Sequence, residues 1–380
     1  MEEKYLELLQ FETSRLFLML SSVNAINFYE GIVPLEYLNN RMKMIVKANP
    51  WLNTRLVKVD KRIKLRYAPK DTGIDIKIIK NPGLYEDMKY SDIVRAVGNL
   101  LVKNGNNLLN SDEPLFRVIV LIEENANKSA IILSLSHFIA DGYTFYSIYK
   151  MFDPQMDIIR LNAERVRDYW HNIEARDAEE VTFPLSAKYL LGFIVRFFLA
   201  KAPQQIQKVP LEWINDQKKK YNNGTTFVST NDIITHLFFK ISRCDVGTMA
   251  ITFRNRLANI NDTLAGNYEG LLLFTKNDYD TPESIRTTVN TYRRCTQTRL
   301  PGFFTCLKSN FATITNWTTF YHHLEFNPEY KCRPLLHLPL RRPGDYLIKN
   351  HMVIFRPNPD EISLLYSMHG VDELIFNLNP

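Results

Sequence analysis

The residues of this chain that are best suited to chemistry are His137, Asp141 and Gly142, which stand in the pattern His-x-x-x-Asp-Gly. Near neutral pH an imidazole can take a proton from a nucleophile and return it to a leaving group. Asp141 can brace the turn through a charge pair, and we expect Gly142 to adopt backbone angles that are closed to other residues. A histidine at the end of a core strand is often structural, so the motif alone does not decide the function.

Two strands and a helix are expected to position these residues. Residues 131–136 are mostly apolar or β-branched, which predicts a buried strand that ends at His137. Residues 113–122 predict a second strand, joined to the first by a turn at 124–128, and residues 143–152 favour a helix. A rigid strand that ends at His137 would aim its ring into a cleft.

Several segments, in order along the chain, resemble the CoA-dependent acyltransferases of the chloramphenicol acetyltransferase superfamily, and the BAHD-type enzymes in particular. They are Pro-x-Leu-x-x-Arg at 50–55 after a helix, the histidine motif at 137–142, Arg-x-Arg-Leu at 254–257 with Gly-Asn at 266–267, and Thr-Asn-Trp at 315–317. The chain departs from the BAHD pattern at 327–345, where the Asp-Phe-Gly-Trp-Gly motif of these enzymes is missing.

The resemblance implies an α/β (α+β) fold of two chloramphenicol-acetyltransferase-like lobes. Each lobe would be a mixed β-sheet with flanking helices, and an active-site channel would run between them. Residues 1–170 would form the N-terminal lobe with the histidine motif, residues 171–217 would cross over, and residues 218–380 would form the C-terminal lobe.

The resemblance also assigns roles around the histidine. In the family, an arginine on a later strand pairs with the aspartate of the motif, and Arg254 matches it, with Arg256 as the alternative if the register slips. A bidentate guanidinium is the best partner for a buried carboxylate, so Asp141 and Arg254 are assigned to structure. The matching strand that faces the histidine carries the residues expected on the acceptor and oxyanion side, Thr315, Asn316 and Trp317, with asparagine where the family has serine.

The cofactor side of the channel is matched by Ser229, Thr230 and Asp232, which resemble the Ser-Thr-x-Asp helix start of the BAHD enzymes. Amides at a helix start suit a phosphate or pantetheine oxygen. Lys218 and Lys219, in a run of three lysines, could hold the phosphates of acyl-CoA, and a solvated loop is the alternative for such a run.

The implied reaction moves an acyl group from acyl-CoA, a co-substrate, to a hydroxyl or amine acceptor, with His137 as general base. It has no covalent intermediate and needs no permanently bound cofactor. One alternative is a wax-ester or condensation-type enzyme with a lipid or carrier-bound substrate, although Ser136 stands where condensation domains have a second histidine. The other alternative is a non-catalytic ligand-binding or interaction protein, which the missing motif favours.

Composition limits the partners and the location. Of the 380 residues 45% are hydrophobic, and the net charge of +6 suits an anionic ligand or membrane surface but does not indicate a nucleic-acid partner. The four cysteines form no CxxC pair, and His322 and His323 would point to opposite faces of a strand, so no disulfide framework or metal site is expected. The charged start lacks the apolar core of a signal peptide.

We therefore expect a monomeric, cytoplasmic protein with a small-molecule or lipid acceptor. Residues 189–199 are apolar almost all round and flanked by basic residues, but are too short to span a bilayer. Burial as a crossover helix is the favoured interpretation of this stretch. Peripheral membrane contact is the alternative.

Overall fold

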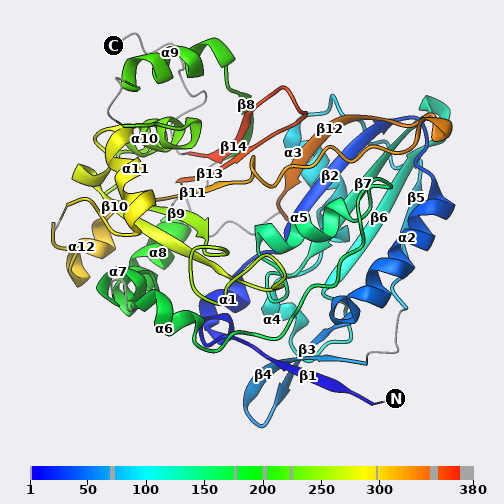
Figure 1. Cartoon of the computed structure of the whole chain (residues 1–380), viewed down its shortest axis with the longest axis horizontal. Helices are drawn as coiled ribbons and strands as arrows, with labels where there is room; N and C mark the ends of the chain where they lie inside the picture. The colour runs from blue at the N-terminus through cyan, green and yellow to red at the C-terminus, as the bar shows by residue number, and fades with distance from the viewer. Residues whose placement is uncertain are drawn as a thin grey trace.

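The computed structural model describes residues 2–68, 73–174, 178–199, 203–222, 226–296, 298–342 and 350–368. Two large mixed sheets lie side by side and carry helices, while a small sheet lies below them in Figure 1. The small sheet has the order β1-β4-β3, with β1 (Lys4–Glu7), β3 (Arg55–Val59) and β4 (Arg62–Tyr67) all antiparallel. The expected fold class, two mixed sheets with flanking helices, is confirmed.

The sheet that positions His137 has the strand order β12-β2-β7-β6-β5. Its pairs are antiparallel except β5 with β6. Its strands are β2 (Val23–Glu30), β5 (Lys77–Lys80), β6 (Phe116–Glu123), β7 (Lys128–Leu135) and β12 (Arg333–Leu340). The central strands are buried at almost every residue, because both faces of the sheet are covered.

One face of this sheet packs against α2 (Leu35–Ala48) and α5 (Gly142–Lys150). The buried residues of α2 recur at helical spacing, which places them on one stripe against the sheet. The other face packs against α3 (Tyr90–Val97) and against apolar residues of two strands of the second sheet, such as Val353 and Leu365. A continuous apolar core therefore joins the two sheets.

The second large sheet has the order β10-β9-β11-β13-β14-β8, with β11 parallel to both of its neighbours. Its strands are β8 (Gln204–Lys208), β9 (Val246–Thr252), β10 (Glu269–Thr275), β11 (Phe311–Asn316), β13 (Asn350–Phe355) and β14 (Ser363–Ser367). Around it lie α9 (Leu211–Tyr221), α10 (Thr230–Ser242) and α11 (Pro282–Thr291) (Figure 1).

The remaining α-helices lie in the left and central parts of Figure 1, below and beside β9 and β10. They are α1 (Arg15–Met19), α4 (Gly105–Leu108), α6 (Tyr169–Glu174), α7 (Ala178–Thr182), α8 (Ala187–Leu199) and α12 (Phe303–Lys308). Gly192 of α8 lies so close to α12 that an added Cβ would meet Cys306 O at 2.3 Å. Across the described ranges, no helix has the length and apolar character needed to cross a bilayer.

Strand β12 comes from the second half of the chain but pairs with β2, so it completes the sheet of the first half. In Figure 1 it is the orange strand beside the blue β2. The pairing of β12 with β2 therefore joins the two halves of the chain. The lobe boundaries at residues 170 and 217 stay a prediction.

Candidate active site

His137 lies between two rigid elements, just after β7 and just before α5. The backbone N–H of Ser136 donates to Leu115 O at 2.8 Å, which holds the strand end in place. Asp141 is the N-cap of α5, because its Oδ1 accepts from the N–H of Thr144 at 2.9 Å. The five residues from 137 to 141 thus form a short turn with both ends fixed.

Asp141 is held by Arg254 and not by the histidine. Arg254 Nη1 lies 2.6 Å from Asp141 Oδ2, and both side chains are 1% exposed. The backbone N–H of Tyr268 also donates to Asp141 Oδ2, at 3.1 Å. A buried carboxylate with this many donors is a structural anchor. Arg256, the alternative partner, lies over the Tyr292 ring instead.

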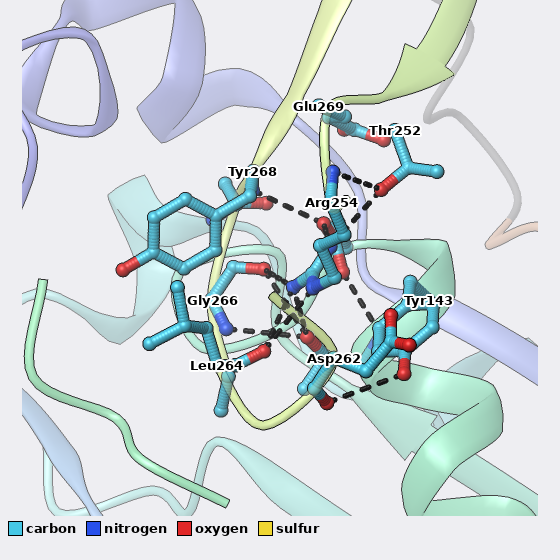
Figure 2. Close-up of polar contacts among 12 residues, drawn as sticks. Tyr143, Thr252, Arg254, Asp262, Leu264, Gly266, Tyr268 and Glu269 are labelled. Atoms are coloured by element: carbon cyan, nitrogen blue, oxygen red, sulfur yellow. Dashed lines mark hydrogen bonds and ion pairs between the residues drawn. The ribbon is translucent and has the colours of Figure 1, made fainter. Parts of the chain in front are cut away.

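The guanidinium of Arg254 also organises the loop that returns toward His137. Figure 2 shows Arg254 surrounded by this loop, and its Nη2 donates to Leu264 O and Gly266 O at 3.1 Å each. The same nitrogen donates to Thr144 Oγ1 at 3.0 Å. Gly266 has φ +124°, and a Cβ there would lie 2.5 Å from Arg165 Nη1, so glycine is required at this turn.

The protonation of the His137 ring is fixed by Asn267. His137 Nδ1 lies 3.0 Å from Asn267 Oδ1. The amide nitrogen of Asn267 donates to Glu12 Oε1 at 2.7 Å and to His137 O at 2.6 Å, so the orientation of the amide is set by two acceptors. Asn267 Oδ1 therefore accepts from Nδ1–H, and the unprotonated nitrogen of the neutral ring is Nε2.

Behind Asn267 lies a buried ion pair that no motif of the sequence predicts. Glu12 is fully buried, and Arg165 Nε donates to its Oε2 at 3.0 Å. Arg165 Nη2 also donates to Phe138 O at 2.8 Å, next to the histidine. The sequence places Asn267 only in the Gly-Asn match to the family, without a contact to His137. That match was the one feature of the sequence that pointed to Asn267. No feature of the sequence pointed to Glu12.

A cavity of about 340 Å³ opens at His137. Of the expected site residues, His137, Gly142, Thr315 and Trp317 line it, and its remaining wall is mostly apolar. Asn316 does not line it, because its side chain turns to Asn231, with Nδ2 3.0 Å from Asn231 Oδ1. The cavity is therefore mostly apolar with a small number of polar side chains, as small-molecule binding sites usually are.

Gly142 has no unusual backbone. It is the first residue of α5, and its φ is not positive. A Cβ at Gly142 would meet Trp317 Nε1 at 3.5 Å, which is ordinary contact. The expectation that Gly142 needs angles closed to other residues is therefore wrong. Its small size instead leaves room beside the indole N–H of Trp317, close to the histidine.

The residues expected on the cofactor side are not brought to this cavity. Ser229 caps α10 in a reciprocal capping box with Asp232, and Thr230 is the first residue of that helix. Asp232 also pairs with Arg286, and burial raises the pKa of Asp232. Lys218 and Lys219 stand in the last turn of α9, so they are helical and not part of a loop. None of these five expected residues lines the cavity at His137.

Two further sets of titratable side chains on the cavity wall were not identified from the sequence. Glu269, the first residue of β10, has its Oε1 3.8 Å from His137 Nε2. Burial raises the pKa of Glu269, with the charge of His137 opposing. Elsewhere on the wall, Arg341 bonds to His351 Nε2, and burial followed by the charge of Arg341 lowers the pKa of His351 well below its usual value.

The paired histidines do not form a metal centre with their neighbours. His322 Nε2 lies 2.8 Å from Asp153 Oδ2, and His323 Nδ1 lies 3.0 Å from the hydroxyl of Tyr321. In the part of the chain that the structure describes, no group of three or more His, Cys, Asp and Glu could hold a metal ion.

No protein-family model and no curated protein matches the chain. Solved structures do match it over nearly its whole length. TRI101 of F. graminearum, in complex with coenzyme A and T-2 mycotoxin, is 12% identical, and the match covers 96% of this chain and 95% of that chain with a TM-score of 0.65. This chain has the chloramphenicol-acetyltransferase-like fold.

Two further matches show how wide the range of proteins with this fold is. Vinorine synthase is 14% identical, with 97% of this chain and 93% of that chain covered and a TM-score of 0.59. The first condensation domain of the CDA synthetase is 11% identical, with 98% and 93% covered and a TM-score of 0.59. The resemblance seen in the sequence is thus confirmed for the fold, which hosts more than one chemistry.

Proposed function

We propose that this protein is an acyltransferase that moves an acyl group from acyl-CoA to a hydroxyl or amine acceptor. The observation that carries the proposal is the hydrogen bond of His137 Nδ1–H to Asn267, which leaves Nε2 with its lone pair at the wall of the cavity. A neutral imidazole in this tautomer, held by a rigid partner, is ready to act as a general base.

The reaction proceeds by direct attack, without a covalent enzyme intermediate. His137 Nε2 takes the proton of the acceptor as it attacks the thioester carbonyl, and then protonates the leaving thiolate of CoA. General base action of this kind contributes about 10²–10⁴ in rate. The indole N–H of Trp317 and the hydroxyl of Thr315, which both line the cavity, are the donors for the oxyanion.

Acyl-CoA is the proposed donor, as a co-substrate and not as a resident cofactor. The fold likeness to TRI101, which was solved with coenzyme A, supports this choice. The residues expected on the cofactor side keep a proposed role only as contacts of the phosphate-bearing part of CoA, away from the cavity. They are Ser229, Thr230, Asp232, Lys218 and Lys219. Basic Lys218 and Lys219 at the end of α9 have the charge for its phosphates.

The deciding experiment measures free thiol released from a panel of acyl-CoAs in the presence of pooled alcohols and amines. We expect release by the wild-type protein and its loss in His137→Ala, with an unchanged melting temperature. His171→Ala is the matched control, since that side chain is 82% exposed. Thiol release that survives in His137→Ala would exclude His137 as the base. A protein inert toward the whole panel would favour the non-catalytic alternative.

A lipid acceptor or long acyl chain, with peripheral membrane contact, is a second proposal that one observation favours. The apolar residues of an exposed patch on the segment before α8, on α8 and on α12 are 37–80% exposed: Leu185, Leu191, Val195, Phe303 and Phe304. Leu185 also lines the cavity, so one residue of the patch lies at the cavity wall. A monomeric, cytoplasmic protein that touches a membrane through this patch is consistent with the proposal.

A further inference from the structure

Glu269 presents a carboxylate to the atom of His137 that would perform the chemistry. Its Oε1 lies 3.8 Å from His137 Nε2, and both residues line the same cavity. The backbone of Glu269 is held firmly, because it pairs with Thr252 in the sheet and its carbonyl accepts from Tyr169 OH at 2.7 Å. The carboxylate is therefore aimed at this position by a rigid strand.

No structural role accounts for the Glu269 carboxylate. Among the described residues, His137 is the one charged partner that comes within 4 Å of it, and no hydrogen-bond donor reaches its oxygens. The other acid of the cavity wall, Glu180, is satisfied by Arg294 Nε at 2.8 Å. The Glu269 side chain is 31% exposed at the cavity wall, and a carboxylate without protein donors beside the proposed base is a candidate for ligand contact.

The number of protons on the acceptor decides which nucleophile satisfies both groups. The nucleophilic atom must lie within hydrogen-bond distance of Nε2, and in that position it also faces Glu269. A hydroxyl has a single proton, which goes to His137 and leaves the carboxylate without a donor. An ammonium group has three, so it can donate to the ring nitrogen and to Glu269 at once, and its positive charge offsets that of the carboxylate.

We infer that the acceptor is a primary amine, and that Glu269 binds its positively charged nitrogen beside His137. This inference rests on the proposed acyltransferase function and narrows it to N-acyl transfer. An ionised Glu269 next to the thioester would oppose the oxyanion unless the nucleophile itself carried positive charge, which an attacking amine does.

The proton balance uses both groups. The bound ammonium gives one proton to His137 Nε2, and the free amine attacks the thioester carbonyl to form the C–N bond. The nitrogen, now cationic in the tetrahedral intermediate, gives a second proton to Glu269. The C–S bond then breaks, His137 protonates the thiolate, and Glu269 releases its proton to solvent. One ammonium and one thioester thus yield an amide, free CoA thiol and one proton.

The test compares amines with alcohols of the same carbon skeleton, such as hexylamine with hexanol and phenethylamine with phenethyl alcohol. Thiol release and the mass of the acylated product are measured for the full chain with one accepted acyl-CoA. We expect the wild-type protein to prefer each amine. Glu269→Gln should raise KM for the amine by about 10- to 100-fold, the loss typical of a hydrogen bond to a charged group, and so reduce or abolish the preference for the amine over the alcohol.

Two further variants and one binding measurement complete the test. Glu180→Gln removes a second carboxylate from the same wall and should leave the amine-to-alcohol ratio unchanged. Glu269→Asp keeps the charge and should retain part of the preference. Calorimetric titration of the wild-type protein with hexylammonium, without an acyl donor, should show binding that is lost in Glu269→Gln.

The inference would be overturned if the wild-type protein acylated the alcohols as fast as the amines, or if Glu269→Gln slowed both equally. Either result would leave the acyltransferase function standing. A protein that released no thiol with any acceptor would instead refute the proposed function itself. Hexylammonium binding that was unchanged in Glu269→Gln would also contradict the role given to this carboxylate.

Discussion

Asn267 governs the proposed chemistry at the residue scale, because it selects which ring nitrogen of His137 faces the cavity. Its amide is fixed by Glu12 and by the carbonyl of His137, and it is fully buried. Glu12 is fixed in turn by Arg165. The histidine is thus oriented by a chain of polar contacts that never enters the cavity, so Asn267 is a positioning residue.

Replacing Asn267 by Ala frees the ring to adopt the other tautomer and leaves Glu12 with one donor fewer. We expect kcat to fall by at least about 10²-fold, within the range contributed by a general base, with KM for acyl-CoA little changed. Steady-state thiol release as a function of acyl-CoA concentration measures both values. Equal losses in kcat and in binding would argue against control of the tautomer.

Glu269 makes stability depend on pH. Burial raises its pKa, with Asp141 adding to the shift and His137 and Arg254 opposing it. Between the ordinary pKa of about 4.3 and the raised value, the folded protein holds a proton that the unfolded chain has lost. The free energy of unfolding therefore falls as pH rises through this window.

Glu269→Gln removes that titration, so we expect its melting temperature to exceed that of the wild type at pH 8. The difference should shrink as pH falls below the ordinary pKa of about 4.3, where the carboxyl becomes protonated in both states. Melting curves at half-unit steps of pH measure this, with the exposed Glu212→Gln as control. Parallel curves for wild type and Glu269→Gln would refute the raised pKa.

At the scale of elements, the start of α5 and the loop from 254 to 268 are joined into one support for the histidine turn. Asp141 caps the helix with one oxygen and binds Arg254 with the other. Arg254 then holds the loop that carries Asn267 through two backbone carbonyls. A helix start and a distant loop are thus positioned by one ion pair.

Asp141→Ala leaves the Arg254 guanidinium buried without its partner and removes the cap of α5. We expect a loss of about 3–5 kcal/mol of unfolding free energy, together with most of the activity. Urea denaturation followed by circular dichroism gives the free energy. A stable but inactive Asp141→Ala would instead assign the aspartate a direct part in catalysis.

Gly266→Ala tests the same loop without a change of charge. The positive φ and the 2.5 Å approach to Arg165 Nη1 make any side chain costly. We expect a destabilisation of about 1–3 kcal/mol, typical of a residue forced into a rare backbone region. Gly302→Ala is the matched control, because an added Cβ there meets nothing within 4 Å. Similar melting temperatures for the two variants would contradict this account.

At the scale of the whole molecule, the cavity draws its wall from both halves of the chain. His137 comes from the first half, whereas Trp317, Glu269 and His351 come from the second. Strand β12 and the apolar core around α3 hold the two sheets together, so these walls keep their positions. Leu185, an exposed residue just before α8, also lines this cavity.

The membrane proposal predicts that the exposed patch contributes to vesicle binding. Phe304 is 80% exposed on α12, and burying a phenylalanine in a bilayer stabilises binding by about 1.5–3 kcal/mol. Phe304→Ser should therefore weaken sedimentation with anionic phospholipid vesicles by about tenfold or more. Tyr5→Ser is the control, since β1 lies on another side of the molecule (Figure 1). Equal binding by both variants would reject this patch as the contact.

Local pattern was enough to predict the strand before His137 and the helix after it, whereas the mixed two-sheet fold was expected from the family resemblance. The strand and the helix depend on the periodicity of apolar residues, which is written directly in neighbouring positions. The helix start at Ser229 was also predicted, because a capping box is local. The angles of Gly142 were predicted wrongly, because glycine has several uses and only its neighbours show which one applies.

What the tertiary structure alone decided is the environment of the histidine. Asn267, Glu12 and Glu269 lie more than one hundred residues from His137 in the sequence, and no local pattern marks a polar side chain as the partner of a distant ring. The pairing of β12 with β2 was hidden for the same reason. The sequence by itself identified His137 as the residue suited to proton transfer. The folding of distant segments around it decided which ring nitrogen faces the cavity and placed the Glu269 carboxylate beside that nitrogen.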